Sequence, residues 1–172
     1  MNFERNGSLF RYRLSLGVFI GGLIASGLTA FPLQMETALL NRWFEINGPV
    51  DPTSNLFPLR AFIYTVHYAL HDTYQRFPFF GYGTDWLGFG HLVIAAFFIL
   101  PFLDPIRYRS ILHIGLLACA GVVVVALTAG PIRGIPFFWT LIDCSFGILG
   151  AIPLIYCLRL ARGICLEDRK GC

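Results

Sequence analysis

Charged residues are scarce in this chain of 172 residues, and their scarcity excludes a water-soluble globular domain. Asp, Glu, Lys and Arg make up 13% of the sequence and hydrophobic residues 56%, whereas soluble domains carry about 25% charged and roughly 45–50% apolar residues. The same balance excludes intrinsic disorder, which requires low hydrophobicity and high charge. The mean hydropathy of +0.65 therefore indicates a protein that is embedded in a lipid bilayer.

Several motifs that carry chemistry in enzymes are also missing. The chain contains no phosphate-binding glycine loop, no GxSxG, no HExxH, no CxxCH and no run of basic and aromatic residues of the kind that binds nucleic acid. Its five cysteines are odd in number and none of them form a CxxC, so neither a disulfide framework nor thiol redox chemistry is expected. These absences exclude nucleic acid as a partner and leave functions that belong to a membrane.

Four apolar stretches are long enough to cross a bilayer. A spanning helix needs about 20 mostly apolar residues to cross about 30 Å of hydrocarbon, and only a helix or a closed barrel satisfies its backbone hydrogen bonds in lipid. The four predicted spans cover residues 14–31, 86–103, 110–130 and 136–158. The first follows basic residues, as the apolar part of a secretory signal does, but its length and the lack of a suitable cleavage site predict a retained helix.

The segment between the first two spans, residues 34–85, is too apolar for a free loop. Residues 35–46 and 56–75 repeat apolar side chains at helical spacing beside charged ones, which is the pattern of a helix that lies in the plane of the membrane surface. Turn-forming residues at 47–55 separate the two. We therefore predict an all-α integral membrane protein, a single domain over residues 1–172, with four transmembrane helices and two amphipathic in-plane helices on the outer face between helices 1 and 2.

The distribution of basic residues sets the predicted orientation. Cytoplasmic loops carry an excess of Lys and Arg, and nine of the 13 basic residues fall on the side that includes both termini. Both termini, including the tail at 159–172, are therefore expected in the cytoplasm, and the segment at 34–85 outside. The predicted location is the plasma (inner) membrane.

Asp143 is the only carboxylate well inside a predicted span, and intramembrane ionisable residues are costly and tend to be functional. Counted from the outer ends of their spans at 1.5 Å per residue, Asp143 and His91 lie at a similar depth of about 10 Å. Both share a helix face with small residues, which favours helix contact. The pair is interpreted as a structural hydrogen bond or as a site for a proton or a ligand, and the third alternative is that the two side chains do not meet. Arg133 and Asp85, near the outer ends of their spans, are further candidates for that site.

His67 and His71 are four residues apart on the second predicted surface helix, the spacing at which two side chains can bind one metal ion. The predicted metal ligands share the outer half of the topology, and they are His67, His71, His91 and Asp143. Such nitrogen and oxygen ligands suit zinc with an open position for water, or a haem with two axial imidazoles. Because an isolated HxxxH also occurs by chance, a structural role for both rings stays open.

The leading functional interpretation is a small membrane protein without catalysis of its own, a subunit or assembly partner of a larger membrane complex. Its predicted partners are the lipid bilayer and other membrane subunits or a second copy of the chain. The first alternative is a membrane enzyme or redox protein with an outward-facing His/Asp metal or haem site. The second is a proton or ion conductor that uses Asp143. A chain with four spanning helices would need to form an oligomer to enclose a path for the ion.

Overall fold

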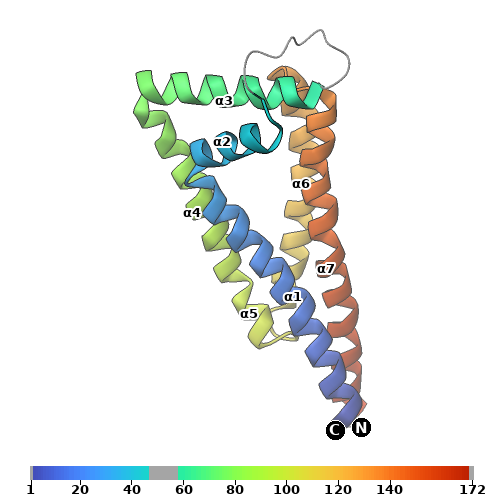
Figure 1. Ribbon diagram of the computed structural model, residues 1–172. Coiled ribbons are helices and arrows are strands. Elements are labelled where there is room, and N and C mark those ends of the chain that lie inside the picture. The colour runs from blue at the N-terminus through green and yellow to red at the C-terminus, as the bar shows by residue number, and fades with distance from the viewer. Residues whose placement is uncertain (1, 47–57, 171–172) are drawn as a thin grey trace. The chain divides into compact units, whose positions relative to one another are not determined.

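The computed structural model describes the backbone of residues 2–46 and 58–170, and the side chains of residues 6–46 and 58–164. Within these ranges the chain is helical and contains no strand, which confirms the predicted all-α class. The elements in chain order (Figure 1) are α1 (Asn2–Ala30), α2 (Leu33–Trp43), α3 (Pro58–Arg76), the 3-10 turn η1 (Pro78–Phe80), α4 (Gly81–Phe97), α5 (Ile99–Leu103), α6 (Arg109–Ile132) and α7 (Phe137–Lys170). The predicted turn at 47–55 lies outside the described residues.

Four helical stretches are long and apolar enough to cross a membrane. They are Asn6–Ala30, Pro78–Leu103, Arg109–Ile132 and Phe137–Ile164. Each overlaps one predicted span almost completely, so the prediction of four apolar helices of spanning length is confirmed. With its 11 residues, α2 is too short to cross, because a spanning helix needs about 20.

Proline and glycine account for two irregularities in these stretches. Proline has no N–H and its ring clashes with the carbonyl group four residues earlier, so Pro101 is preceded by a break at Phe98 that separates α4 from α5. The N–H of Phe98 is shared there between the carbonyl oxygens of Ile94 and Ala95. Gly134, between α6 and α7, has a φ of 70°, a left-handed conformation that glycine adopts without steric cost.

The chain divides into two compact units. Unit 1 consists of Met1–Leu23 and Ile94–Cys172, and unit 2 consists of Ile24–Val93. Unit 1 therefore holds most of α1 together with α5, α6 and α7, and unit 2 holds α2, α3, η1 and most of α4. The single domain over residues 1–172 stays a prediction.

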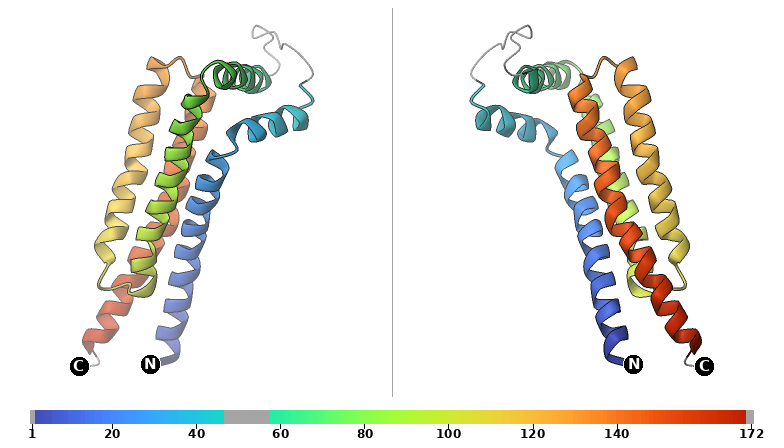
Figure 2. Two further views of the ribbon diagram at one scale, coloured as in Figure 1. Left: turned by 90° about the vertical axis from the view of Figure 1, so that its left-hand side faces the viewer. Right: turned by 90° about the vertical axis from the view of Figure 1, so that its right-hand side faces the viewer.

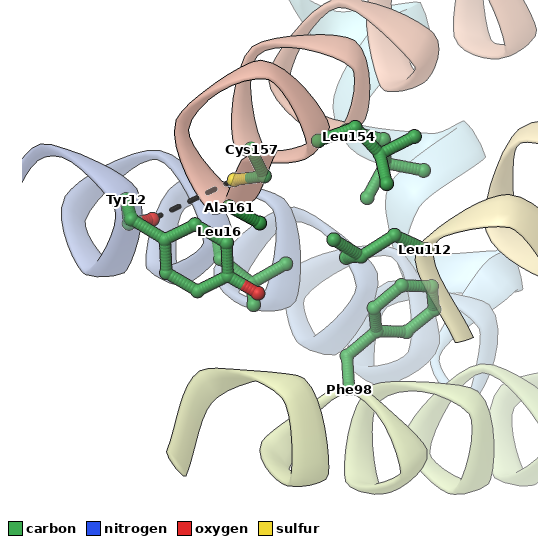
Figure 3. Packing of buried hydrophobic residues seen from close by; sticks show 8 residues of the cluster. Tyr12, Leu16, Phe98, Leu112, Leu154, Cys157 and Ala161 are labelled. Carbon is green, nitrogen blue, oxygen red and sulfur yellow. Dashed lines mark hydrogen bonds between the residues drawn. The ribbon is translucent and has the colours of Figure 1, made fainter. Parts of the chain in front are cut away.

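The core of unit 1 joins α1 to α7 and to the chain around Phe98. Its buried residues are Tyr12, Leu16, Phe98, Leu112, Leu154, Cys157, Leu158 and Ala161 (Figure 3). Two polar groups in this core are paired: the Tyr12 hydroxyl donates to the Pro101 carbonyl oxygen at 2.9 Å, and the Cys157 thiol donates to the Tyr12 carbonyl oxygen at 3.6 Å. The first bond ties α1 to α5, and the second ties α1 to α7.

Antiparallel α6 and α7 pack along their length through glycine residues (Figure 2). A Cβ added at Gly147 of α7 would lie 2.5 Å from the Cys119 carbonyl oxygen, and one added at Gly130 of α6 would lie 2.9 Å from the Thr140 hydroxyl. A larger residue at Gly147 would meet backbone and push the two helices apart, whereas one at Gly130 would press on the Thr140 side chain. Such close approach through small residues is how helices associate in lipid, where no hydrophobic force drives them together.

In unit 2, α2 and α3 lie side by side, and α3 runs crosswise to α4 (Figures 1 and 2). The end of α1 approaches α4 through two glycines. A Cβ at Gly27 would lie 2.9 Å from the Gly88 carbonyl oxygen, and one at Gly88 would lie 2.8 Å from the Gly27 carbonyl oxygen. Gly88 is therefore a contact residue.

Candidate functional site

The predicted site residues are divided between the two units. Unit 1 contains Asp143 and Arg133; the members in unit 2 are His67, His71, Asp85 and His91. Across the residues that the structure describes, no group of three or more His, Cys, Asp and Glu side chains is arranged to hold a metal ion. The three histidines of unit 2 therefore do not gather at one point, and each part of the predicted site is described within its own unit.

His67 is fixed by a hydrogen bond between α3 and α2. Its Nδ1 lies 3.1 Å from the Thr37 hydroxyl oxygen, and the Thr37 hydroxyl donates to the Gln34 carbonyl oxygen at 3.0 Å. A hydroxyl group has one hydrogen to donate, and Thr37 uses its hydrogen for Gln34. The hydrogen-bond network thus assigns the proton of the neutral ring to Nδ1 of His67, which leaves the lone pair on Nε2.

His71 has the same tautomer for a different reason. The side-chain amide nitrogen of Gln75 lies 2.9 Å from His71 Nε2, and an amide nitrogen only donates. His71 Nε2 is therefore the acceptor, and its Nδ1 carries the proton. The rings of His67 and His71 are stacked, with centroids 6.4 Å apart and planes at 22°, so two neighbouring imidazoles both carry their lone pair on Nε2.

His91, on α4, is oriented by its own helix. Its Nδ1 lies 2.8 Å from the Leu87 carbonyl oxygen, which only accepts, so Nδ1 carries the proton and the lone pair of the neutral ring is on Nε2. His113, on α6, makes the same kind of contact with the Arg109 carbonyl oxygen at 3.1 Å. A single hydrogen bond of this kind fixes the orientation of the ring, and it is no evidence that the histidine binds a metal ion or another ligand.

Asp143 lies half-buried on α7, three residues after Thr140 and four before Gly147. These two neighbours face Gly130 and Cys119 of α6, so Asp143 lies along α7 between two close contacts with α6. Among the described residues of unit 1, none forms a hydrogen bond or an ion pair with the Asp143 carboxylate. A carboxylate within a spanning helix is costly without a partner, which makes this position a candidate for a proton or a ligand.

The other two predicted residues lie near helix ends. Arg133 is the C-terminal cap of α6 and its backbone N–H donates to the Ala129 carbonyl oxygen. Its side chain is exposed, as is that of Asp85 near the start of α4. At these exposed positions neither charge pays the desolvation cost of burial, and a role for the two residues in a site stays a prediction.

One residue with a clear role was absent from the sequence-based candidates. The guanidinium group of Arg60, on α3, donates to the carbonyl oxygens of Phe44 and Glu45 at the end of α2, groups that a helix leaves without partners. A hollow beside it is lined by Trp43, Phe44, Glu45, Leu59 and Arg60. No pattern in the sequence links Arg60 to the end of α2, because the segment between the two helices does not indicate how α2 and α3 are aligned with each other.

No family model matches this sequence, and neither the curated proteins nor the solved structures contain one that is significantly similar to it. Function is therefore inferred from the chain's own residues and their geometry.

Proposed function

We propose that this protein is a small integral membrane protein without catalysis of its own, a subunit or assembly partner of a complex in the plasma (inner) membrane. The four apolar helices of spanning length support the membrane location. The N-terminal end of α1 and the C-terminal end of α7 lie at the same end of unit 1 (Figure 2). This arrangement and the excess of basic residues on the same side support an orientation with both termini in the cytoplasm.

The proposal includes α2 and α3 as in-plane helices at the outer surface. Met35, Leu39 and Trp43 of α2 are 74%, 51% and 76% exposed, and their spacing of four residues forms one apolar stripe. On a helix too short to cross, such a stripe suits the boundary between lipid headgroups and acyl chains. The aromatic residues that follow α3 are also exposed and suit the same interface: Phe77, Phe79, Phe80, Tyr82 and Trp86.

The assembly role depends on an exposed face of α1 in unit 1, the small-residue face, formed by Gly21 and Gly22. A Cβ added at Gly21 or Gly22 would meet no described atom within 4 Å. Glycine inside a helix costs about 1 kcal/mol relative to alanine, and no described side chain packs on this face to offset that cost. Small residues let a second helix approach closely in lipid, so this face supports contact with another membrane subunit or a second copy of the chain.

The test replaces both glycines with leucine and measures the mass of the native particle. We expect the Gly21→Leu/Gly22→Leu protein, purified in a mild detergent, to lose its partner and shift to the mass of one chain, because leucine blocks close approach. Gly121→Leu is the matched control: a Cβ at Gly121 also meets no described atom, but its neighbours Leu117 and Val125 are bulky and exposed. A complex that survives the double substitution, or a wild-type chain that is already alone, would contradict the proposal.

The position of Asp143 supports a second candidate function, in which the protein conducts protons or ions. Its carboxylate has no partner in unit 1, and carboxylates inside membrane helices mark ion pathways in many transporters. We expect wild-type protein in liposomes to carry a proton flux that Asp143→Asn abolishes and that the exposed-carboxylate control Asp85→Asn retains. Wild-type protein without flux above empty liposomes would refute this function and leave the assembly role unaffected.

A further inference from the structure

Two neighbouring imidazoles on α3 carry their lone pair on the same ring nitrogen, Nε2. His67 and His71 are stacked one turn apart, and their hydrogen bonds leave both lone pairs on Nε2. A neutral imidazole nitrogen with a free lone pair is the commonest metal ligand in proteins. We propose that His67 Nε2 and His71 Nε2 form a binding site for one divalent transition-metal ion, a role that goes beyond assembly into a complex.

Thr37 is the positioning residue of this site. It is the buried residue of α2, only 6% exposed. Its hydroxyl oxygen accepts a hydrogen bond from the Nδ1–H of His67, and its hydroxyl hydrogen is donated to the Gln34 carbonyl oxygen. Histidines that bind metals almost always donate their other N–H to an oxygen, which fixes the tautomer and the orientation of the ring. The contact between α2 and α3 supplies this second interaction before any metal is bound.

Gln75 competes with the metal for one of the two ligands. Its amide donates to His71 Nε2, so it must rotate away when the metal binds. The Gln75 side chain is exposed, and water can satisfy the amide after rotation. His71 is therefore released at a small cost, and removal of the amide should strengthen binding.

The ligand set decides which ions bind. Two imidazole nitrogens with the remaining positions left to water suit copper, nickel and zinc, whereas Mg²⁺ and Ca²⁺ require oxygen ligands. At a nitrogen site that imposes no geometry on the ion, Cu²⁺ binds more tightly than either Ni²⁺ or Zn²⁺. Binding should weaken as the solution becomes acidic, because protons compete for the same lone pairs.

The full chain in detergent, titrated with Cu²⁺ alone, provides the first test. We expect one equivalent to bind, with an electron paramagnetic resonance spectrum that shows two nitrogen ligands, and we expect His67→Ala and His71→Ala each to weaken binding by at least about tenfold. His113→Ala is the matched control, because that ring is exposed like the ring of His71 and is oriented by one hydrogen bond, from its Nδ1 to the Arg109 carbonyl oxygen. Unchanged affinity in both α3 variants, or equal losses in the control, would overturn the proposal.

A second test separates the positioning role of Thr37 from a general loss of structure. Thr37→Val keeps the shape and removes the oxygen, and we expect Cu²⁺ affinity to fall by about 10–100-fold at unchanged helix content. Thr37→Ser should restore the affinity, and Gln75→Ala should raise it above wild type. Wild-type affinity in Thr37→Val would refute the positioning role, as would a loss of affinity in Thr37→Ser as large as that in Thr37→Val.

Discussion

Replacement of Gly147 with alanine is a direct test of the contact between α6 and α7. The added Cβ would lie 2.5 Å from the Cys119 carbonyl oxygen, 3.1 Å from a methyl carbon of Val123 and 3.4 Å from Val122 Cβ. Ordinary contact begins at 3.4 Å, so the shortest approach is about 0.9 Å too close. The obstructing atom is backbone, and only a shift of one helix against the other can relieve it.

Two opposing effects set the size of the change. Alanine is favoured over glycine inside a helix by about 1 kcal/mol, and overpacking of a close contact typically costs about 1–3 kcal/mol. We expect the clash to win, because α6 and α7 are joined by a short connection and pack along their length. The net result is a protein about 1–2 kcal/mol less stable than wild type.

Gly121→Ala supplies the comparison for that result. Gly121 is also inside α6, but a Cβ there would meet no described atom within 4 Å. The helix preference then acts alone, and this variant should be more stable than wild type by up to about 1 kcal/mol. Unfolding of both variants in mixed detergent micelles, followed by circular dichroism, gives the two free energies of unfolding. Equal stabilisation by both substitutions would show that α6 and α7 do not approach at Gly147.

Three further predictions concern the core, the topology and the intramembrane pair. Tyr12→Phe leaves the buried Pro101 carbonyl oxygen without its donor and should lower the free energy of unfolding by about 1–3 kcal/mol; an unchanged midpoint in the same unfolding assay would contradict this. Reporter fusions should place both termini in the cytoplasm and residue 55, which lies outside the described residues, on the opposite side; a cytoplasmic signal at residue 55 would overturn the four-span orientation. If Asp143 and His91 form the pair that the sequence analysis interprets as a structural hydrogen bond, Asp143→Asn and His91→Gln together should cost less than the sum of the single variants, with a coupling of about 1 kcal/mol, whereas additive costs would mean that the two side chains do not interact.

The helices of unit 2 show a limit of hydrophobic periodicity: it predicts a helix but not which side of the helix packs against protein. The periodicity of residues 35–46 marks Leu39 and Trp43 as part of an apolar stripe, but an apolar stripe can face either protein or lipid. In the structure both side chains are exposed, and the buried residue of α2 is the polar Thr37. In a membrane protein the apolar side of a helix is not necessarily its packed side, because lipid is as apolar as a protein core.

Glycine shows the same limit. Gly27, Gly88, Gly130 and Gly147 are all close contacts, whereas Gly21, Gly22 and Gly121 face open space. All of them occur in apolar helices, and nothing in the local sequence distinguishes the two groups. The distinction depends on which backbone lies opposite each residue.

The sequence by itself determined the helical class, the four stretches of spanning length and the i, i+4 spacing of His67 and His71. These properties belong to contiguous segments, since lipid leaves the backbone no alternative to internal hydrogen bonds. Only the tertiary structure decided the tautomer of His67, because its partner Thr37 is 30 residues away on another helix. It also decided the surroundings of Asp143, because the atoms that face a side chain across a helix pair depend on the register of both helices, and no stretch of sequence encodes that register locally.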